Sequence, residues 1–255
     1  MNKLADNTPD RAEEFIQLFN RVADYLWQLV NPEKFAAFGK LVDVAATRSA
    51  AVHANAAALK QFAMLRNAIV HDADYPPHIV AVPSSEALSK FKQVAGEVLE
   101  PKHLIPTFAT RVRCFSLTDN LPKVLGFMRE HDFSQVMVRN SGGRLGMLTV
   151  EGITWWLADN VGGDQNPLNA ATIGDIIPLE PPGGFMIMSS GKTIFDAAEA
   201  FRNLIHREAT RLYAIIVTGS GDDSDEPIGF VTPWDILHNP NLMEGVGDIG
   251  RTAAP

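Results

Sequence analysis

The sequence predicts a chain in two parts, an N-terminal helical bundle followed by a pseudo-twofold pair of β-α-β-β-α units. Over residues 10–105, apolar side chains recur every three or four positions, which is typical of amphipathic helices. After that region, short apolar strands alternate with helices, and a strand-turn-helix signature begins at Leu145 and again at Ile228, 83 residues later. This internal repeat indicates an α + α/β fold. We expect domains at 1–105 and 106–255.

The helical part divides at its turn signals. One apolar stripe runs through the first segment, at Phe15, Leu18, Phe19, Val22, Leu26 and Leu29. Asn31–Pro32 ends this helix, and Pro32 suits the first turn of the next one. An Ala- and Leu-rich stretch with a break near Thr47–Ser49 follows, up to Pro76 and Pro77. Ser84 then fits the N-cap of a last helix. The sequence predicts a bundle of about four helices, with Pro101–Pro106 as the linker.

The second part repeats one order of elements. The first unit covers about residues 107–160 and is expected to contain strand 111–117, helix 120–133, strands 135–138 and 145–149, and helix 150–160. The second unit covers about residues 172–240, with strand 185–190, helix 193–208, strand 211–217, strand 228–232 and helix 233–238. A single unit leaves one apolar sheet face uncovered. The two units are therefore expected to pack together.

Composition excludes several classes of protein. The net charge of −8 argues against general electrostatic binding of nucleic acid, although binding of RNA at one local site stays open. The single Cys114 excludes an intrachain disulfide framework and a cysteine-based zinc site. The His residues have no paired ligand spacing, so no metal site is predicted. The chain has no apolar run long enough for a membrane span and no signal-peptide core, which indicates a cytoplasmic protein without membrane contact.

The second unit carries a pair of residues suited to a nucleotide. Thr232 ends a strand, and Asp235 follows in the first turn of a helix, so both side chains reach the same small volume. An ionised Asp accepts hydrogen bonds from the two vicinal hydroxyls of a ribose, and free helix amides suit a phosphate. Arg211 is a candidate phosphate contact, and the apolar strand beside it suits a purine. The alternative is that Thr232 and Asp235 only cap the helix.

The first unit departs from this pattern. Thr149 occupies the same place as Thr232, but Gly152 stands where the acid is expected. Glu151 is adjacent, and on a helix it points about 100° away. The sequence therefore predicts one nucleotide per chain.

The order of elements and the signature Gly229-Phe230-Val231-Thr232-Pro233-Trp234-Asp235 resemble tandem cystathionine-β-synthase-type (CBS) domains over about residues 107–240. The resemblance implies a Bateman-type module. In such modules the clefts between units often bind adenosine nucleotides, here AMP, ADP or ATP as a regulatory ligand. It also implies a homodimer.

The helical part carries a second, weaker resemblance. Arg66, Asn67 and His71 match the Arg-polar-x-x-x-His motif of HEPN domains, over roughly residues 10–100. In that family the motif belongs to metal-independent ribonucleases. His71 could move the proton of a ribose 2′-hydroxyl, and Arg66 could stabilise the charge on phosphorus. Two alternatives to a plain nucleotide sensor stay open: a nucleotide-gated ribonuclease, and a purely structural oligomerisation protein.

Two further features have local interpretations. Trp155 and Trp156 are neighbours on one predicted helix, so one is expected in the core and the other over an interface or cleft. The acidic run Asp222, Asp223, Asp225 and Glu226 indicates a solvated hairpin loop.

Overall fold

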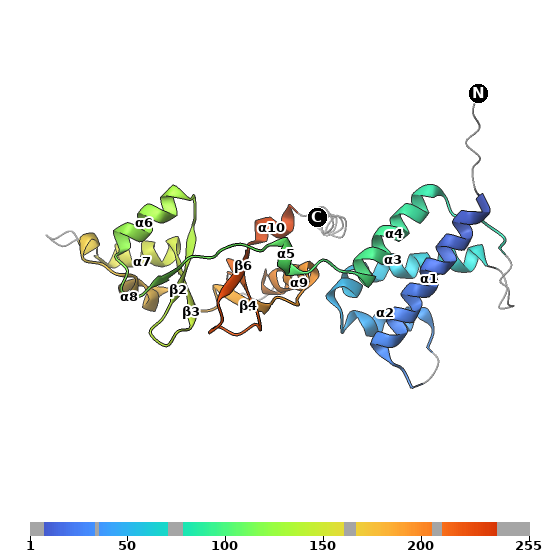
Figure 1. Cartoon of the computed structure of the whole chain (residues 1–255), viewed down its shortest axis with the longest axis horizontal. Helices are drawn as coiled ribbons and strands as arrows, with labels where there is room; N and C mark the ends of the chain where they lie inside the picture. The colour runs from blue at the N-terminus through green and yellow to red at the C-terminus, as the bar shows by residue number, and fades with distance from the viewer. Residues whose placement is uncertain (1–7, 34–35, 71–78, 161–166, 206–210, 239–255) are drawn as a thin grey trace, which may run out of the picture. The chain divides into compact units, whose positions relative to one another are not determined.

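The computed structural model describes residues 8–33, 36–70, 79–160, 167–205 and 211–238 (Figure 1). These residues form two compact units, one that ends at Lys102 and one that begins at His103. The first unit is helical, and the second contains two three-stranded sheets. The α + α/β fold class expected from the sequence is therefore confirmed.

Four long helices build the described part of the first unit: α1 (Thr8–Val30), α2 (Phe38–Ala46), α3 (Ala50–Ile69) and α4 (Ser85–Leu99). The Ser49 side chain caps α3 by accepting from Val52 N–H (3.3 Å), and Ser84 caps α4 by accepting from Ala87 N–H (3.1 Å). The predicted break near residues 47–49 and the predicted cap at Ser84 are confirmed. The placement of Pro32 in the next helix is wrong, because α2 begins only at Phe38, after Asn31 has turned the chain with a left-handed φ of 43°.

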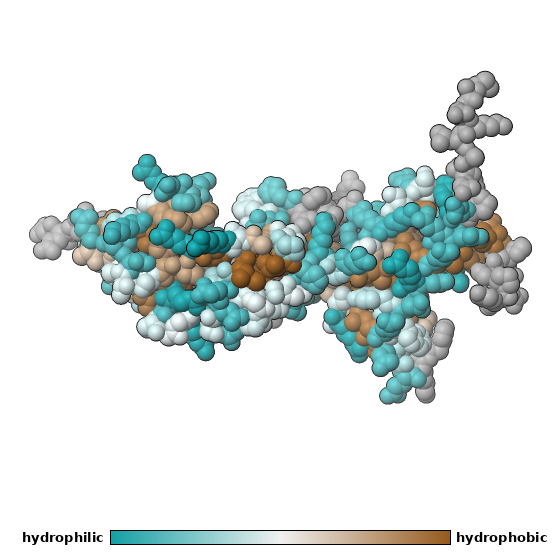
Figure 2. Space-filling model, viewed as in Figure 1, coloured by the Kyte–Doolittle hydropathy of each residue, from teal (hydrophilic) through white to brown (hydrophobic). Residues whose placement is uncertain are grey.

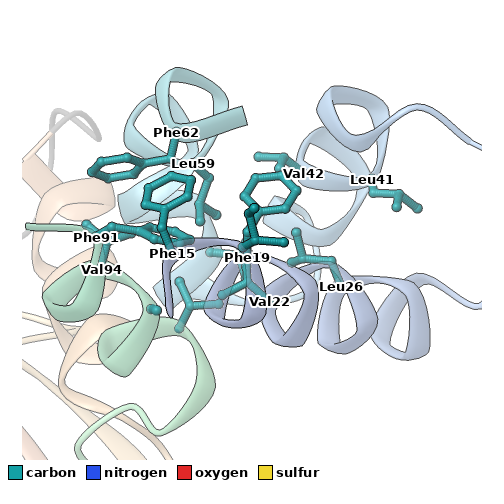
Figure 3. Close-up of a cluster of buried hydrophobic side chains, with 14 of the residues drawn as sticks. Phe15, Phe19, Val22, Leu26, Leu41, Val42, Leu59, Phe62, Phe91 and Val94 are labelled. Atoms are coloured by element: carbon teal, nitrogen blue, oxygen red, sulfur yellow. The ribbon is translucent and has the colours of Figure 1, made fainter. Parts of the chain in front are cut away.

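Aromatic side chains from three helices meet in the core of this unit (Figure 3). Phe15 on α1 and Phe62 on α3 each lie with their ring centroid 4.7 Å from that of Phe91 on α4. Phe91 is fully buried, and its neighbours come from residues far apart in the sequence. In the view of Figure 2, hydrophilic residues cover much of the surface of α1 to α4, as expected for amphipathic helices that bury one stripe.

The second unit contains the predicted repeat. One sheet has the order β1 (Cys114–Ser116), β2 (Gln135–Arg139), β3 (Leu145–Thr149), and the other β4 (Phe185–Ser189), β5 (Ala214–Thr218), β6 (Pro227–Val231). In both sheets the first pair is parallel and the second antiparallel. With helices α6 (Leu121–Glu130), α7 (Val150–Asn160), α9 (Ile194–Ile205) and α10 (Pro233–Leu237), each repeat has the order β-α-β-β-α. The expected order is confirmed.

Strands β2 and β5 are buried on both faces, and this joins the repeats. On β2, Val136 and Val138 pack with α6 and α7 in the core of the first repeat. Met137 lies between them on the opposite face and packs with Ala214 and Ile216 of β5. Continuous apolar runs such as this one are typical of strands covered on both sides. The two sheets therefore share one apolar layer.

The segment that begins at His103 belongs to the second repeat. Short helix α5 (Leu104–Thr107) buries Leu104 completely, and the Leu104 N–H donates to Lys192 O (2.8 Å). Thr110 N–H donates to Ile228 O (3.2 Å), next to Gly229. A Cβ at Gly229 would come within 2.9 Å of Phe108 O, so a side chain there would displace this segment. The expectation that the linker extends to Pro106 is wrong, because these backbone groups are already bonded to the second repeat.

Three short elements that the sequence analysis did not predict lie between the repeats: η1 (Pro167–Asn169), α8 (Ile173–Ile176) and η2 (Ile177–Leu179). Ile173 and Ile176 are fully buried in the core of the first repeat. Their packing places Glu180 beside β3.

Candidate functional site

A cleft of about 2270 Å³ opens in the second unit between the two repeats. It is larger than the roughly 300–1,000 Å³ usual for small-molecule sites. From the second repeat it contains the three predicted nucleotide contacts, Arg211, Thr232 and Asp235. From the first repeat and the segment before it come further polar and aromatic residues: Arg111, Arg113, Phe127, His131, Arg139, Glu151 and Trp155.

Thr232 and Asp235 form a capping box at the start of α10. Asp235 Oδ2 accepts from both Thr232 N–H (2.7 Å) and Thr232 Oγ1 (2.7 Å). Thr232 Oγ1 in turn accepts from Asp235 N–H (3.4 Å). The capping alternative left open by the sequence is thus present. Asp235 is exposed, and its Oδ1 has no hydrogen bond to any residue that the structure describes.

Two other Thr-x-x-Asp pairs in this unit have the same geometry. Asp175 Oδ2 accepts from Thr172 N–H (2.8 Å), and Asp196 Oδ2 accepts from Thr193 N–H (2.8 Å). In both, the threonine hydroxyl also donates to the same oxygen. Neither pair is among the described residues that line the cleft. Of these three caps, only Thr232–Asp235 combines the capping role with a position in the cleft.

A hydrogen bond crosses the cleft from one repeat to the other. Tyr213, beside β5, donates its hydroxyl to Glu151 on α7. Burial and the neighbouring Glu151 carboxylate raise the pKa of Tyr213, while Arg211 acts in the opposite direction. The phenol therefore stays protonated at neutral pH and remains a donor. Sequence reasoning missed this pair, because Glu151 and Tyr213 are 62 residues apart and no motif connects them.

The arginines of the cleft have different surroundings. The Arg113 guanidinium lies over two aromatic rings, 4.7 Å from the centroid of Phe115 and 4.8 Å from that of Phe127. Arg139 is bound to the loop between β5 and β6, through Ser224 O (3.2 Å) and Asp225 O (3.2 Å). Arg139 is thus a structural contact, whereas Arg111, Arg113 and Arg211 are exposed at the cleft.

The acidic loop is more ordered than the sequence indicated. Asp222 Oδ1 accepts from Ser224 N–H (2.8 Å), and Asp225 Oδ2 accepts from Ser220 N–H (2.9 Å). These serine hydrogen bonds, side-chain and backbone together, lower the pKa of both carboxyls. Glu226 pairs with Arg139 (3.2 Å). The loop is thus the expected hairpin loop, with exposed or half-buried side chains, and it also contacts Arg139 of the first repeat.

The two tryptophans separate as expected. Trp156 is buried in the core of the first repeat, and Trp155 is 45% exposed and lines the cleft.

The first repeat does have a carboxylate at its threonine. Glu180 accepts from Thr149 N–H (2.6 Å) and from Thr149 Oγ1 (2.8 Å). Thr149 therefore has a carboxylate partner that its own motif, with Gly152 in place of the acid, does not supply. The acid comes from 31 residues away, and no sequence signal marked it.

The residues of the Arg-polar-x-x-x-His motif are only partly placed. Arg66 is half-buried and Asn67 exposed near the end of α3. His71 lies outside the described residues, so the ribonuclease alternative stays a prediction.

The described ranges contain no group of three or more His, Cys, Asp and Glu residues placed to hold a metal ion. Burial raises the pKa of the half-buried Cys114, which keeps it a thiol at neutral pH. None of the helices in these ranges is both long and apolar enough to cross a membrane.

No family model and no curated protein matches the chain. Among solved structures, a CBS domain-containing protein of unknown function from Kribbella flavida is similar, with 15% identity over 53% of this chain and 94% of that one, at a TM-score of 0.41. A second similar structure is CBSX2 in complex with AMP, with 13% identity over 57% of this chain and 96% of that one, at a TM-score of 0.37. The CBS domain of a bacterial CNNM/CorC family Mg²⁺ transporter in complex with ATP is also similar (17%, 60% and 93%, TM-score 0.41).

The fold is assigned from the strand order of this chain, in which a parallel pair of strands followed by an antiparallel pair occurs twice. Gly229, Thr232 and Asp235 of the signature lie at the end of the second sheet and the start of α10. The unit that begins at His103 is a pair of β-α-β-β-α units, the order of elements expected from the sequence resemblance to CBS domains.

Proposed function

We propose that the unit beginning at His103 senses an adenosine nucleotide, AMP, ADP or ATP, bound in the cleft at the second repeat. One observation carries this proposal. Asp235 lines the cleft while one of its oxygens, Oδ2, holds the helix cap and the other, Oδ1, has no partner among the described residues.

Each part of a nucleotide finds a suitable group in this cleft. Asp235 Oδ1 would accept hydrogen bonds from the vicinal hydroxyls of a ribose. Leu212, Tyr213 and Phe230 offer apolar and aromatic surface for the purine. Arg211, exposed at the same cleft, would pair with phosphate. Because Glu151 of the other repeat bonds to Tyr213, a ligand at this place would also change the contact between the repeats.

The proposed role is regulatory. A ligand that touches both repeats favours one of their relative arrangements, and the helical unit would be the output or dimerisation part. The coupling between ligand and output can be no larger than the difference in the ligand's affinity for the two states. A homodimer, the assembly expected from the family resemblance, is checked by sedimentation equilibrium with and without ligand.

The test is calorimetric titration of the full chain with AMP, ADP and ATP. AMP and ATP are the ligands named for two of the similar structures. We expect Asp235→Ala to weaken binding at least about tenfold, the loss of one charge-assisted hydrogen bond. Asp175→Ala is the matched control, because it removes the same kind of cap outside the cleft.

Equal binding by the two variants would show that Asp235 serves only as a cap. Wild-type protein that binds none of the three nucleotides would exclude the sensor function.

A further inference from the structure

In the first repeat, Glu180 accepts the hydrogen bonds of the threonine at the helix start, as Asp235 does in the second repeat. In the second repeat, Asp235 accepts from the N–H and the hydroxyl of Thr232. In the first repeat, Glu180 accepts from the N–H (2.6 Å) and the hydroxyl (2.8 Å) of Thr149. The third bond of the cap is also present, since Gly152 N–H donates to Thr149 Oγ1 (3.1 Å). All the hydrogen bonds of the capping box are therefore formed with an acid from another segment.

Gly152 is what makes room for this acid. A Cβ at Gly152 would lie 2.2 Å from Glu180 Oε1 and 2.5 Å from Glu180 Cδ, far inside contact distance. Gly152 and Glu180 are thus complementary, because the Glu180 carboxylate occupies the space that a side chain at position 152 would fill.

The two carboxylates differ in how many oxygens remain available to a ligand and in whether they line the cleft. Asp235 uses a single oxygen for its threonine and lies in the cleft. Glu180 uses both oxygens, is half-buried, and binds a threonine that is only 1% exposed. Neither Thr149 nor Glu180 is among the described residues that line the cleft. No hydroxyl of a ribose could reach Thr149 while Glu180 is in place.

We infer that Glu180 is an internal substitute for the ribose-binding acid, one that caps α7 and closes the first repeat to a ligand. The module then takes one nucleotide per chain. The ligand part of this inference rests on the proposed function, whereas the capping part does not.

A cycle of variants tests the capping part by thermal unfolding of the full chain. Glu180→Ala removes the two hydrogen bonds that the carboxylate accepts from Thr149 and is expected to lower the melting temperature by a few degrees. Gly152→Asp alone is expected to lower it too, because the new side chain meets Glu180. In the double variant the new Asp can bond to Thr149 as Asp235 bonds to Thr232, and we expect the melting temperature to recover.

The control is Glu130→Ala, at an exposed glutamate of α6, which is expected to change nothing. Additive losses in the double variant, or an unchanged melting temperature in Glu180→Ala, would overturn the pairing of residues 152 and 180.

Titration with AMP tests the ligand part. We expect one site per chain in the wild type and two in the Glu180→Ala/Gly152→Asp variant, whose new carboxylate has one oxygen left for a ribose. Two sites in the wild type, or one in the double variant, would show that Glu180 does not close the repeat. If the wild type binds no AMP, the proposed function fails, and the melting cycle still decides the role of Glu180.

Discussion

The surroundings of the Glu180 side chain disfavour its ionised form. Burial raises its pKa above the ordinary 4.5, repulsion from Glu151 adds to the effect, and the hydrogen bonds from Thr149 reduce it. The folded chain therefore holds this proton at a pH where the unfolded chain has lost it. The resulting contribution to stability is full below about pH 4.5 and is lost as the pH rises through the folded-state pKa.

Glu180→Gln removes this titration and keeps an acceptor for Thr149. We expect the melting temperature of the wild type to fall relative to that of Glu180→Gln as the pH rises from 4.5, with the difference levelling off above the folded-state pKa. Differential scanning calorimetry at several pH values measures the difference. Parallel profiles for the two proteins would show that Glu180 titrates normally.

At the scale of single residues, the sequence predicts proximity only where one motif contains both residues. Thr232 and Asp235 are three positions apart, so their proximity follows from local geometry, and both line the cleft. Glu180 meets Thr149 only because the intervening segment folds back on the first repeat, through the buried Ile173 and Ile176. No local sequence pattern marks such a contact, so it could not be predicted.

At the scale of elements, two hairpin loops hold the repeats together. Leu145 N–H, at the start of β3, donates to Asp223 O (2.9 Å) in the loop between β5 and β6. Arg139, at the end of β2, donates to the carbonyls of Ser224 and Asp225 and pairs with Glu226 (3.2 Å). Arg144 adds an exposed ion pair with Asp223.

Arg139→Ala is therefore expected to destabilise the second unit by about 1–3 kcal/mol, because it leaves several carbonyl groups of the loop without a donor. Arg144→Ala removes only an exposed pair and is expected to cost no more than about 1 kcal/mol. Urea unfolding followed by circular dichroism gives both free energies of unfolding. The loop contact would be unimportant if the two variants were equally stable.

The order of elements could be predicted because each has a clear periodicity. The apolar stripe of α1 and the runs in β2 and β5 are long enough to identify their type, and the repeat confirms the assignment. Segment 103–113 and the short helix α8 could not be predicted. Their conformation depends on hydrogen bonds and burial against distant residues, as with Leu104 and Lys192.

At the scale of the whole molecule, the buried clusters found among the described residues belong to one unit or the other. The buried cluster of the first unit contains only residues between Ala12 and Val98. Among the described residues, two buried clusters of the second unit contain residues between Val112 and Phe230. Units with separate cores are expected to unfold in separate transitions, since neither needs the other to bury its apolar surface.

Calorimetry of the full chain can assign those transitions. Phe91 is fully buried against Phe15 and Phe62, so Phe91→Ala is expected to cost the helical unit about 3–5 kcal/mol and to lower one transition. Nucleotide at about 100 times its dissociation constant is expected to stabilise the other by about 2.7 kcal/mol. One transition that moves with both changes would contradict independent cores. If there are two, any shift of the helical transition on adding nucleotide measures the coupling that a regulatory protein requires.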